Sequence, residues 1–159
     1  MISQPETRIS DKALKVWRIS SGIVAAIAWS IIAGVASLFF IFDWPLWILG
    51  LLAMLEAIHT ILSLTVFPGV RWRRWRYQVR EQEIELQQGI FVIRRTLIPM
   101  VRVQHVDTFQ GPLLRKYNLA TVMISTAATT HEIPALEEEE AESLRIQISK
   151  LARVADDDV

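Results

Sequence analysis

The 159-residue chain is electrically balanced, with 17 basic and 17 acidic side chains and a formal net charge of zero. This balance argues against a general nucleic-acid-binding protein, which would be basic overall or over one large face. The chain has no cysteine, which excludes a disulfide scaffold, a thiolate zinc site and a cysteine nucleophile. Hydrophobic residues make up 52% of the sequence, a high share that is expected when part of a chain lies in lipid.

Residues 19–42 form the first long apolar run, and residues 1–18 precede it as an N-terminal segment. The run carries no charged side chain, and its polar residues are serines, whose hydroxyl groups can bond back to helix carbonyls. A helix of about 20 apolar residues is long enough to cross the hydrocarbon core of a bilayer. We therefore expect a first transmembrane helix here.

A second apolar run covers residues 44–67. It is expected to end at residues 68–69, where proline cannot continue the helical ladder and glycine permits a sharp turn. The connection between the two runs is too short to form a domain, which predicts an antiparallel transmembrane hairpin over residues 19–67. Trp44 and Trp47 occupy positions typical of the aromatic belt at a membrane interface.

Basic residues flank the predicted hairpin at both ends, whereas the turn between its helices carries only Asp43. Lys12, Lys15 and Arg18 precede the first run, and four arginines follow the second within residues 71–76. Under the positive-inside rule, this bias places both termini in the cytoplasm. A cleaved signal peptide fits poorly, because the first run is too long for such a segment and a second run follows at once.

Two ionisable residues, Glu56 and His59, interrupt the second run. They share one helix face, and charged groups at this depth usually face a protein interior. One interpretation is a Glu-x-x-His half-site for a metal, which would need carboxylates from other helices and therefore an oligomer. The interpretation that we favour is a polar clasp, either between the two side chains or with a partner helix.

Residues 68–153 change to short β segments and one final helix, which predicts a cytoplasmic domain of the α+β class. Residues 87–89 predict a hairpin turn with the glycine at positive φ, and residues 90–93 predict the start of the next strand. Residues 120–126, which are rich in β-branched side chains, and residues 131–133 predict two further strands.

The C-terminal part begins with an acidic turn at residues 137–140, which suits a helix N-terminus. Four apolar residues then recur at helical spacing and form one stripe: Ala141, Leu144, Ile148 and Leu151. We expect an amphipathic helix that covers an open face or end of a bent sheet. An acidic tail is expected over residues 154–159.

Several short sequence patterns follow one another through the predicted domain. They are Tyr77-x-Val79, Gly89, Leu97-Ile98-Pro99, Val103-Gln104-x-Val106, Pro112-Leu113-x-Arg115 and Leu119-Ala120-Thr121-Val122. With the two apolar runs, they make residues 17–151 resemble the YdbS-like bacterial membrane proteins, which carry a bacterial pleckstrin-homology (PH) domain of the second type. The resemblance implies a PH-like fold, a strongly bent and partly open β-barrel capped by a C-terminal helix. It also implies a non-enzymatic role in the bacterial inner membrane, often beside a larger relative with duplicated domains.

The stretch that follows the second run, which we call the juxtamembrane cluster, is the first candidate site. It consists of Arg71, Trp72, Arg73, Arg74, Trp75 and Arg76. Guanidinium groups beside a membrane span can bind anionic lipid headgroups at about 1 kcal/mol each, and the two tryptophans can lie at the interface. The alternative is that these arginines only fix the topology, and the two roles are compatible.

A second candidate is a docking surface of four arginines in the predicted domain: Arg94, Arg95, Arg102 and Arg115. If they converge on one face they form an anion or protein-docking surface, and otherwise they belong to a solvated sheet face. No catalytic, cofactor or metal site is expected. His131 and Glu132 do not complete an HExxH zinc motif, because residue 135 is alanine. The uncharged turn at residues 87–89 gives no reason to expect phosphoinositide binding.

These observations predict a membrane-anchored, non-enzymatic interaction module at the inner leaflet. Its expected partners are anionic lipid headgroups and either a membrane protein with related domains or further copies of this chain, and not nucleic acid. The resemblance alone suggests a role in cell-envelope maintenance or stress. The alternative is a component of an oligomeric transporter, in which Glu56 and His59 form a metal or proton site.

Overall fold

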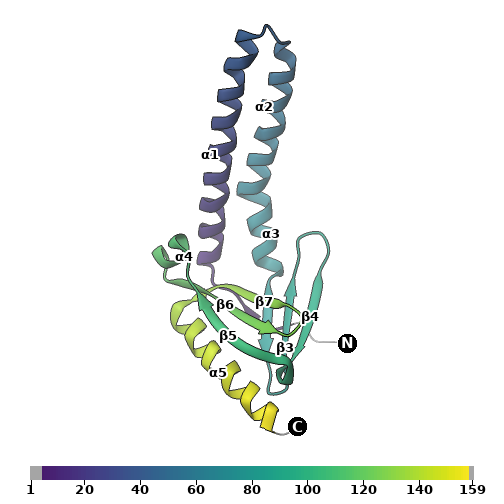
Figure 1. Ribbon diagram of the computed structural model, residues 1–159, viewed down its shortest axis with the longest axis vertical. Helices are drawn as coiled ribbons and strands as arrows, with labels where there is room; N and C mark the ends of the chain where they lie inside the picture. Colours follow the sequence, from purple (N-terminus) through teal and green to yellow (C-terminus); the bar gives the residue numbers. More distant parts are fainter. Residues whose placement is uncertain (1–4, 158–159) are drawn as a thin grey trace. The chain divides into compact units, whose positions relative to one another are not determined.

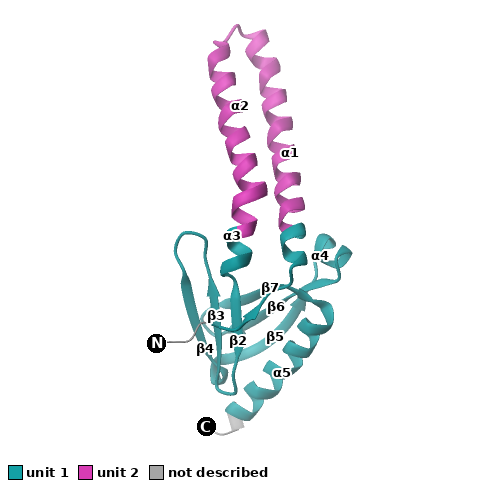
Figure 2. Ribbon diagram, turned by 180° about the vertical axis from the view of Figure 1, so that it is seen from behind, with its two compact units in different colours: residues 1–16, 70–159 teal, residues 17–69 magenta. Residues whose placement is uncertain are grey.

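The computed structural model describes residues 5–157, which fall into two compact units (Figure 2). Residues 17–69 form a helical unit. Residues up to 16 and from 70 onward form a second unit, the β unit, which is built around two β-sheets. The β unit is therefore assembled from both sides of the helical unit in the sequence.

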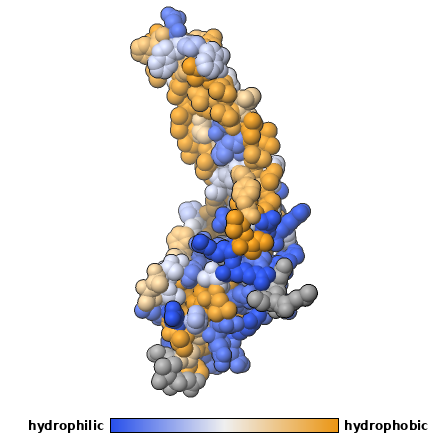
Figure 3. Space-filling view, turned by 90° about the vertical axis from the view of Figure 1, so that its right-hand side faces the viewer, coloured by the Kyte–Doolittle hydropathy of each residue, from blue (hydrophilic) through white to orange (hydrophobic). Residues whose placement is uncertain are grey.

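Two long antiparallel helices make up the helical unit and its immediate flanks (Figure 1). Helix α1 covers Lys12–Ile41. The second helix consists of α2 (Leu46–Ile61), a π-helical segment (Leu62–Val66) and α3 (Phe67–Arg74). Both are long and apolar enough to cross a membrane, at 30 and 29 residues. Their surface is largely hydrophobic (Figure 3), as expected for helices whose surroundings are lipid.

Both helices extend beyond the predicted spans. The second helix passes through residues 68–69, where the sequence analysis expected it to end. The π-helical segment explains this continuity, since the Phe67 N–H already binds the carbonyl of Leu62, five residues back. The hydrogen-bond ladder has thus shifted just before Pro68, whose missing N–H would otherwise interrupt it.

The β unit contains two antiparallel sheets that are bent and do not close into one barrel within the described residues. The first sheet has the order β1 (Thr7–Arg8), β2 (Arg76–Val79), β3 (Glu83–Gln88) and β4 (Arg94–Pro99). The second has the order β5 (Val103–Phe109), β6 (Leu119–Thr126) and β7 (Thr130–Glu137). A 3-10 turn (Met100–Arg102), α4 (Pro112–Lys116) and α5 (Glu138–Asp157) complete the unit. The predicted α+β arrangement, an open bent sheet with a C-terminal helix, is confirmed.

The core of the β unit is formed by side chains of both sheets and of α5. Its largest fully buried members are Trp75, Ile84, Met100, Leu119, Ile124, Ile133, Leu136 and Ile148. The predicted apolar stripe of α5 takes part in this core, since Ala141 and Leu144 are buried as well. Burial of a side chain of this size contributes about 1.5–3 kcal/mol relative to exposure.

The first described residues belong to the β unit, which corrects the prediction of a separate N-terminal segment over residues 1–18. Thr7 of β1 lies opposite Tyr77 of β2, and the Ser10 N–H donates to the carbonyl of Ala135 at 3.2 Å. Ile9 is only 2% exposed. The strand could not be predicted from the sequence, because two residues are too few to show an alternating pattern.

Two other elements are longer than predicted. β7 does not stop after residues 131–133 but runs through Pro134 to Glu137, and its register against β6 shifts along the way. Such a bulge accommodates a proline, because a residue outside the ladder needs no N–H donor. Helix α5 continues to Asp157, so the described part of the acidic tail predicted at 154–159 is helical, and residues 158–159 lie outside the described residues.

Candidate membrane interface

The residues of the juxtamembrane cluster lie on different elements and differ in burial. Arg71 to Arg74 lie at the end of α3, and Arg76 begins β2. Trp75 joins the two elements and is 2% exposed. Because the chain turns there from helix to strand, this side chain lies in the core, which removes it from the lipid contacts expected of the cluster. Arg73 is exposed.

Trp72 and Arg76 contact the N-terminal part of the β unit. The Trp72 Nε1–H donates to the carbonyl of Ser10 at 3.3 Å, and the guanidinium of Arg8 lies 5.7 Å from the centre of the same ring. Arg76 Nη1 donates to the carbonyl of Pro5 at 3.4 Å. These side chains hold together the two chain segments from which the β unit is built.

Arg74 contacts the hairpin that β3 and β4 form. Its Nη1 donates to the carbonyl of Ile90, and its own carbonyl accepts a bond from Gln87 Nε2 at 3.4 Å. Gln87 is 4% exposed, and its side-chain oxygen accepts a bond from Arg95 Nε at 3.0 Å. The end of α3 is thus tied to the β3–β4 hairpin through a buried amide.

Residues 89–93 form the loop between β3 and β4, which we call the hairpin loop; the expectation that residues 90–93 start a strand is wrong. Gly89 has φ +129°, as predicted for the turn, and a Cβ there would lie 1.9 Å from the carbonyl oxygen of Val92. Three apolar side chains follow on the surface: Phe91 (85% exposed), Val92 (79%) and Ile93 (52%). Their unbroken apolar sequence, which lacks the alternation of a half-buried strand, is the signal that could have revealed them.

A groove of about 330 Å³ lies beside the hairpin loop. It is lined by Arg71, Trp75, Gln88, Gly89, Ile90 and Arg94. The structure thus brings together one arginine from each of the two candidate sets. Of the other members of the predicted docking surface, Arg95 lies beside Arg94 on β4, where it is bonded to Gln87. The remaining two lie on separate elements, because Arg102 ends the 3-10 turn after β4 and Arg115 belongs to α4.

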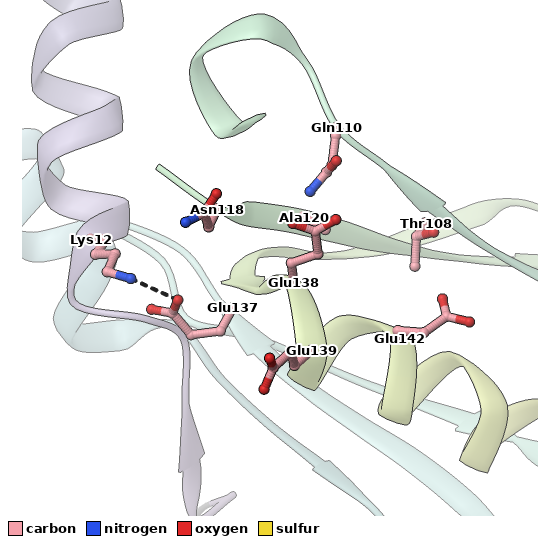
Figure 4. A pocket seen from close by; sticks show the side chains of 9 residues that line it. All are labelled: Lys12, Thr108, Gln110, Asn118, Ala120, Glu137, Glu138, Glu139 and Glu142. Atoms are coloured by element: carbon pink, nitrogen blue, oxygen red, sulfur yellow. Dashed lines mark hydrogen bonds and ion pairs between the residues drawn. The ribbon is translucent and has the colours of Figure 1, made fainter. Parts of the chain in front are cut away.

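A larger hollow of about 1150 Å³ is acidic (Figure 4). It is lined by Lys12, Thr108, Gln110, Asn118, Ala120, Glu137, Glu138, Glu139 and Glu142. Glu137 accepts hydrogen bonds from Lys12 Nζ at 2.8 Å and from the Ser10 hydroxyl at 2.7 Å, and these bonds lower its pKa. With four glutamates and one lysine, this hollow is electrostatically unsuited to an anionic headgroup.

The predicted intramembrane pair lies within a wider polar network. The Thr60 hydroxyl donates to Glu56 Oε1 at 3.2 Å and accepts a bond from Trp29 Nε1 of α1 at 3.3 Å, while His59 Nδ1 lies 3.4 Å from Glu56 Oε1. The side chain of Glu56 is 15% exposed and that of His59 is 52% exposed. Thr60 and Trp29 were missed because a contact between two helices has no periodic signal. Among the described residues, no three potential metal ligands gather in one place.

The chain is similar to one protein family and to two curated relatives. The family described as the bacterial PH domain matches residues 16–152. The UPF0699 transmembrane protein YdbS of Bacillus subtilis (strain 168) is 56% identical over 159 residues, which cover 100% of both chains. The UPF0699 transmembrane protein YdbT of the same organism is 28% identical over 85 residues, 51% of this chain and 17% of that protein. No solved structure matches the chain.

Proposed function

Because the chain belongs to the bacterial PH domain family and is a YdbS-like membrane protein, we propose that it is a non-enzymatic interaction module anchored in the bacterial cell membrane. The helical hairpin spans the bilayer, and the β unit lies at the cytoplasmic face. Arg73, with Arg71 and Arg74 beside it on α3, contacts anionic headgroups there. The module serves maintenance of the cell envelope by binding another membrane protein.

The divided construction of the β unit carries this proposal. Its two chain segments, residues 5–16 and 70–157, flank the hairpin on either side and fold into one compact unit. If both helices cross the bilayer, the two segments emerge on the same side, since one compact unit cannot fold across a membrane. The basic residues at both flanks favour the cytoplasmic side.

The topology is tested by thiol labelling, because the natural chain has no cysteine. Single cysteines replace Trp44 at the hairpin turn, Thr7 of β1 and Glu81 between β2 and β3, all of which are exposed. A membrane-impermeant maleimide added to intact cells should label only the Trp44→Cys variant. Thr7→Cys and Glu81→Cys should react only after permeabilisation, and labelling of either one in intact cells would reject the proposal.

Assembly within the membrane is the second part of the proposal. His59 is an ionisable side chain that is half-exposed on a mainly apolar helix, whereas Glu56 is covered by its own hairpin. Polar groups at this depth are costly unless protein covers them. We therefore expect a partner helix at His59, supplied by a membrane protein with a related domain or by a second copy of this chain.

A crosslinking pull-down from native membranes tests this part. His59→Leu should reduce the crosslinked partner, whereas Thr65→Val should not, because the Thr65 hydroxyl is already bonded to the carbonyl of Ile61 in its own helix. An unchanged crosslinked product in His59→Leu would reject assembly through this residue. Stoichiometric metal in the purified protein, or a pH-dependent flux in vesicles, would instead favour a transporter component.

A further inference from the structure

The hairpin loop exposes three consecutive apolar side chains, Phe91, Val92 and Ile93, which the proposed anchoring does not use. Consecutive apolar residues on the surface of a soluble unit normally have a function, because exposure to water is unfavourable and promotes aggregation. Figure 3 faces the side on which Figure 1 draws the β3–β4 hairpin, and on this side of the β unit hydrophobic atoms lie among strongly hydrophilic ones.

The hairpin loop is held in a defined shape. Gly89 permits a turn so tight that its backbone approaches the carbonyl of Val92. Arg74 binds the carbonyl of Ile90, and the Gln87 amide joins Arg74 to Arg95. These contacts fix the base of the loop against the end of α3, and they leave the apolar tip projecting from the β unit.

The contact with Arg74 links the loop to the chain segment that leaves the proposed membrane span. The helix over Leu46–Arg74 has 29 residues and is about 43 Å long. A hydrocarbon core is about 30 Å thick, and the headgroup regions extend the bilayer to about 40–45 Å. In the proposed topology Arg74 follows the apolar run over residues 44–67 closely enough to lie near the headgroups. The base of the loop is bonded to Arg74, so the loop lies within reach of the same lipid surface.

The charges beside the loop suit an anionic lipid surface. Arg94 follows the apolar tip directly and is exposed. Arg71 lines the same groove beside the loop base, but it is half-buried and has the carboxylate of Glu132 nearby, so Arg94 is the cation that faces the lipid. No acidic residue occurs between residues 84 and 106 except Glu85, which is 5% exposed and lies 3.4 Å from Arg80. Apolar side chains next to arginines are the combination that binds the headgroup–acyl boundary.

We propose that the hairpin loop is a second membrane contact, in which Val92 and its apolar neighbours enter the headgroup–acyl boundary and Arg94 binds lipid phosphates. The inference rests on the proposed anchoring of the helical hairpin in the membrane. It adds a second point of attachment to the helical hairpin. A loop inserted in the membrane would restrict the rotation of the β unit over the bilayer. The occupant of the apolar surface is lipid, not another protein.

The test measures the depth of a nitroxide label in the full-length protein. Val92→Cys is labelled and reconstituted at high lipid dilution into vesicles of phosphatidylglycerol and phosphatidylethanolamine. Collisions with oxygen, which concentrates in lipid, should exceed those with a water-soluble nickel chelate. Glu81→Cys in the β2–β3 turn and Ile146→Cys on α5, exposed sites away from the loop, should show the reverse ratio. Ile93→Cys provides a second label on the same loop and should agree with Val92→Cys.

The contribution of the arginine is measured on the same label. Arg94→Gln should lower the ratio of lipid-inserted to water-exposed label about fivefold, which is the factor expected for one charge at an anionic surface. Vesicles of neutral phosphatidylcholine should lower this ratio in a similar way. A label at residue 92 that behaves like the one at residue 81 would overturn the proposal. A signal that requires a high protein-to-lipid ratio would also overturn it, since the occupant would then be a second copy. Failure of the anchoring itself appears separately, as labelling of Glu81→Cys in intact cells.

Discussion

Substitution of Ile9 by alanine tests whether the N-terminal segment is part of the β unit. Ile9 is 2% exposed, next to a strand whose residue Thr7 lies opposite Tyr77. Truncation of a buried isoleucine to alanine costs about 2–5 kcal/mol, and a position beside a two-residue edge strand should fall near the lower end. For a unit of roughly 100 residues, about 2–3 kcal/mol corresponds to a melting temperature lowered by about 10–15 °C. A free N-terminal segment would give no change.

The assay follows unfolding of the β unit through a reporter cysteine in place of Ala141, which is fully buried. The purified protein is heated in detergent, and the temperature at which the thiol becomes reactive is compared with and without Ile9→Ala. Ile146→Ala is the matched control, because Ile146 is 55% exposed on α5 and its loss should change stability by less than about 0.5 kcal/mol. Equal melting temperatures for Ile9→Ala and Ile146→Ala would refute the assignment of residues 5–16 to the β unit.

Three further substitutions test individual contacts of the β unit. The Tyr77 hydroxyl donates to Glu140 at 2.7 Å, and burial raises the pKa of Tyr77. The contribution of the protonated hydroxyl to folding stability is therefore complete below about pH 10, and it is lost at higher pH. Tyr77→Phe should therefore cost about 1–2 kcal/mol at neutral pH and flatten the alkaline decline in melting temperature. The pKa of Glu137 is lowered by its lysine and serine donors, so its stabilisation is present above its ordinary pKa of 4.5 and lost as the pH falls through the lower folded value. Glu137→Gln should remove this acid sensitivity and cost less than about 1 kcal/mol at neutral pH, because the pair is exposed. Gly89→Ala should destabilise the β unit by about 1–3 kcal/mol in chemical denaturation, whereas Gly111→Ala, whose Cβ would meet only a ring atom at 3.8 Å, is the control.

The elements that the sequence predicted well depend on long or regular patterns. The two apolar helices follow from long apolar runs whose length matches a bilayer. The stripe of Ala141, Leu144, Ile148 and Leu151 on α5 follows from helical spacing, and the first three are buried while Leu151 is half-buried. The hairpin turn at Gly89 follows from a residue that tolerates positive φ. In each case neighbouring residues in the sequence carry enough information to define the local conformation.

The candidate site was predicted only in part, because its contacts join distant segments. The arginines around residue 71 and those around residue 94 were two separate sets in the sequence, and the end of α3 and the β3–β4 hairpin bring Arg71 and Arg94 to one groove. Trp75 was expected at the lipid, but the turn from helix to strand directs it into the core. The pattern of residues in a segment shows which face of that segment is apolar. It does not show which other segments will contact that face in the folded protein.

The sequence by itself determined that this chain has two apolar helices long enough to cross a membrane, with basic flanks, and an α+β domain, since hydrophobic length, charge bias and periodicity are local properties. Only the tertiary structure decided that the domain begins before the first helix, and that residues 90–93 form an exposed apolar loop tied to Arg74. The physical reason is that strand pairing and burial are settled by contacts between segments far apart in the chain. An edge strand such as β1 forms only when the rest of the sheet is present to pair with it.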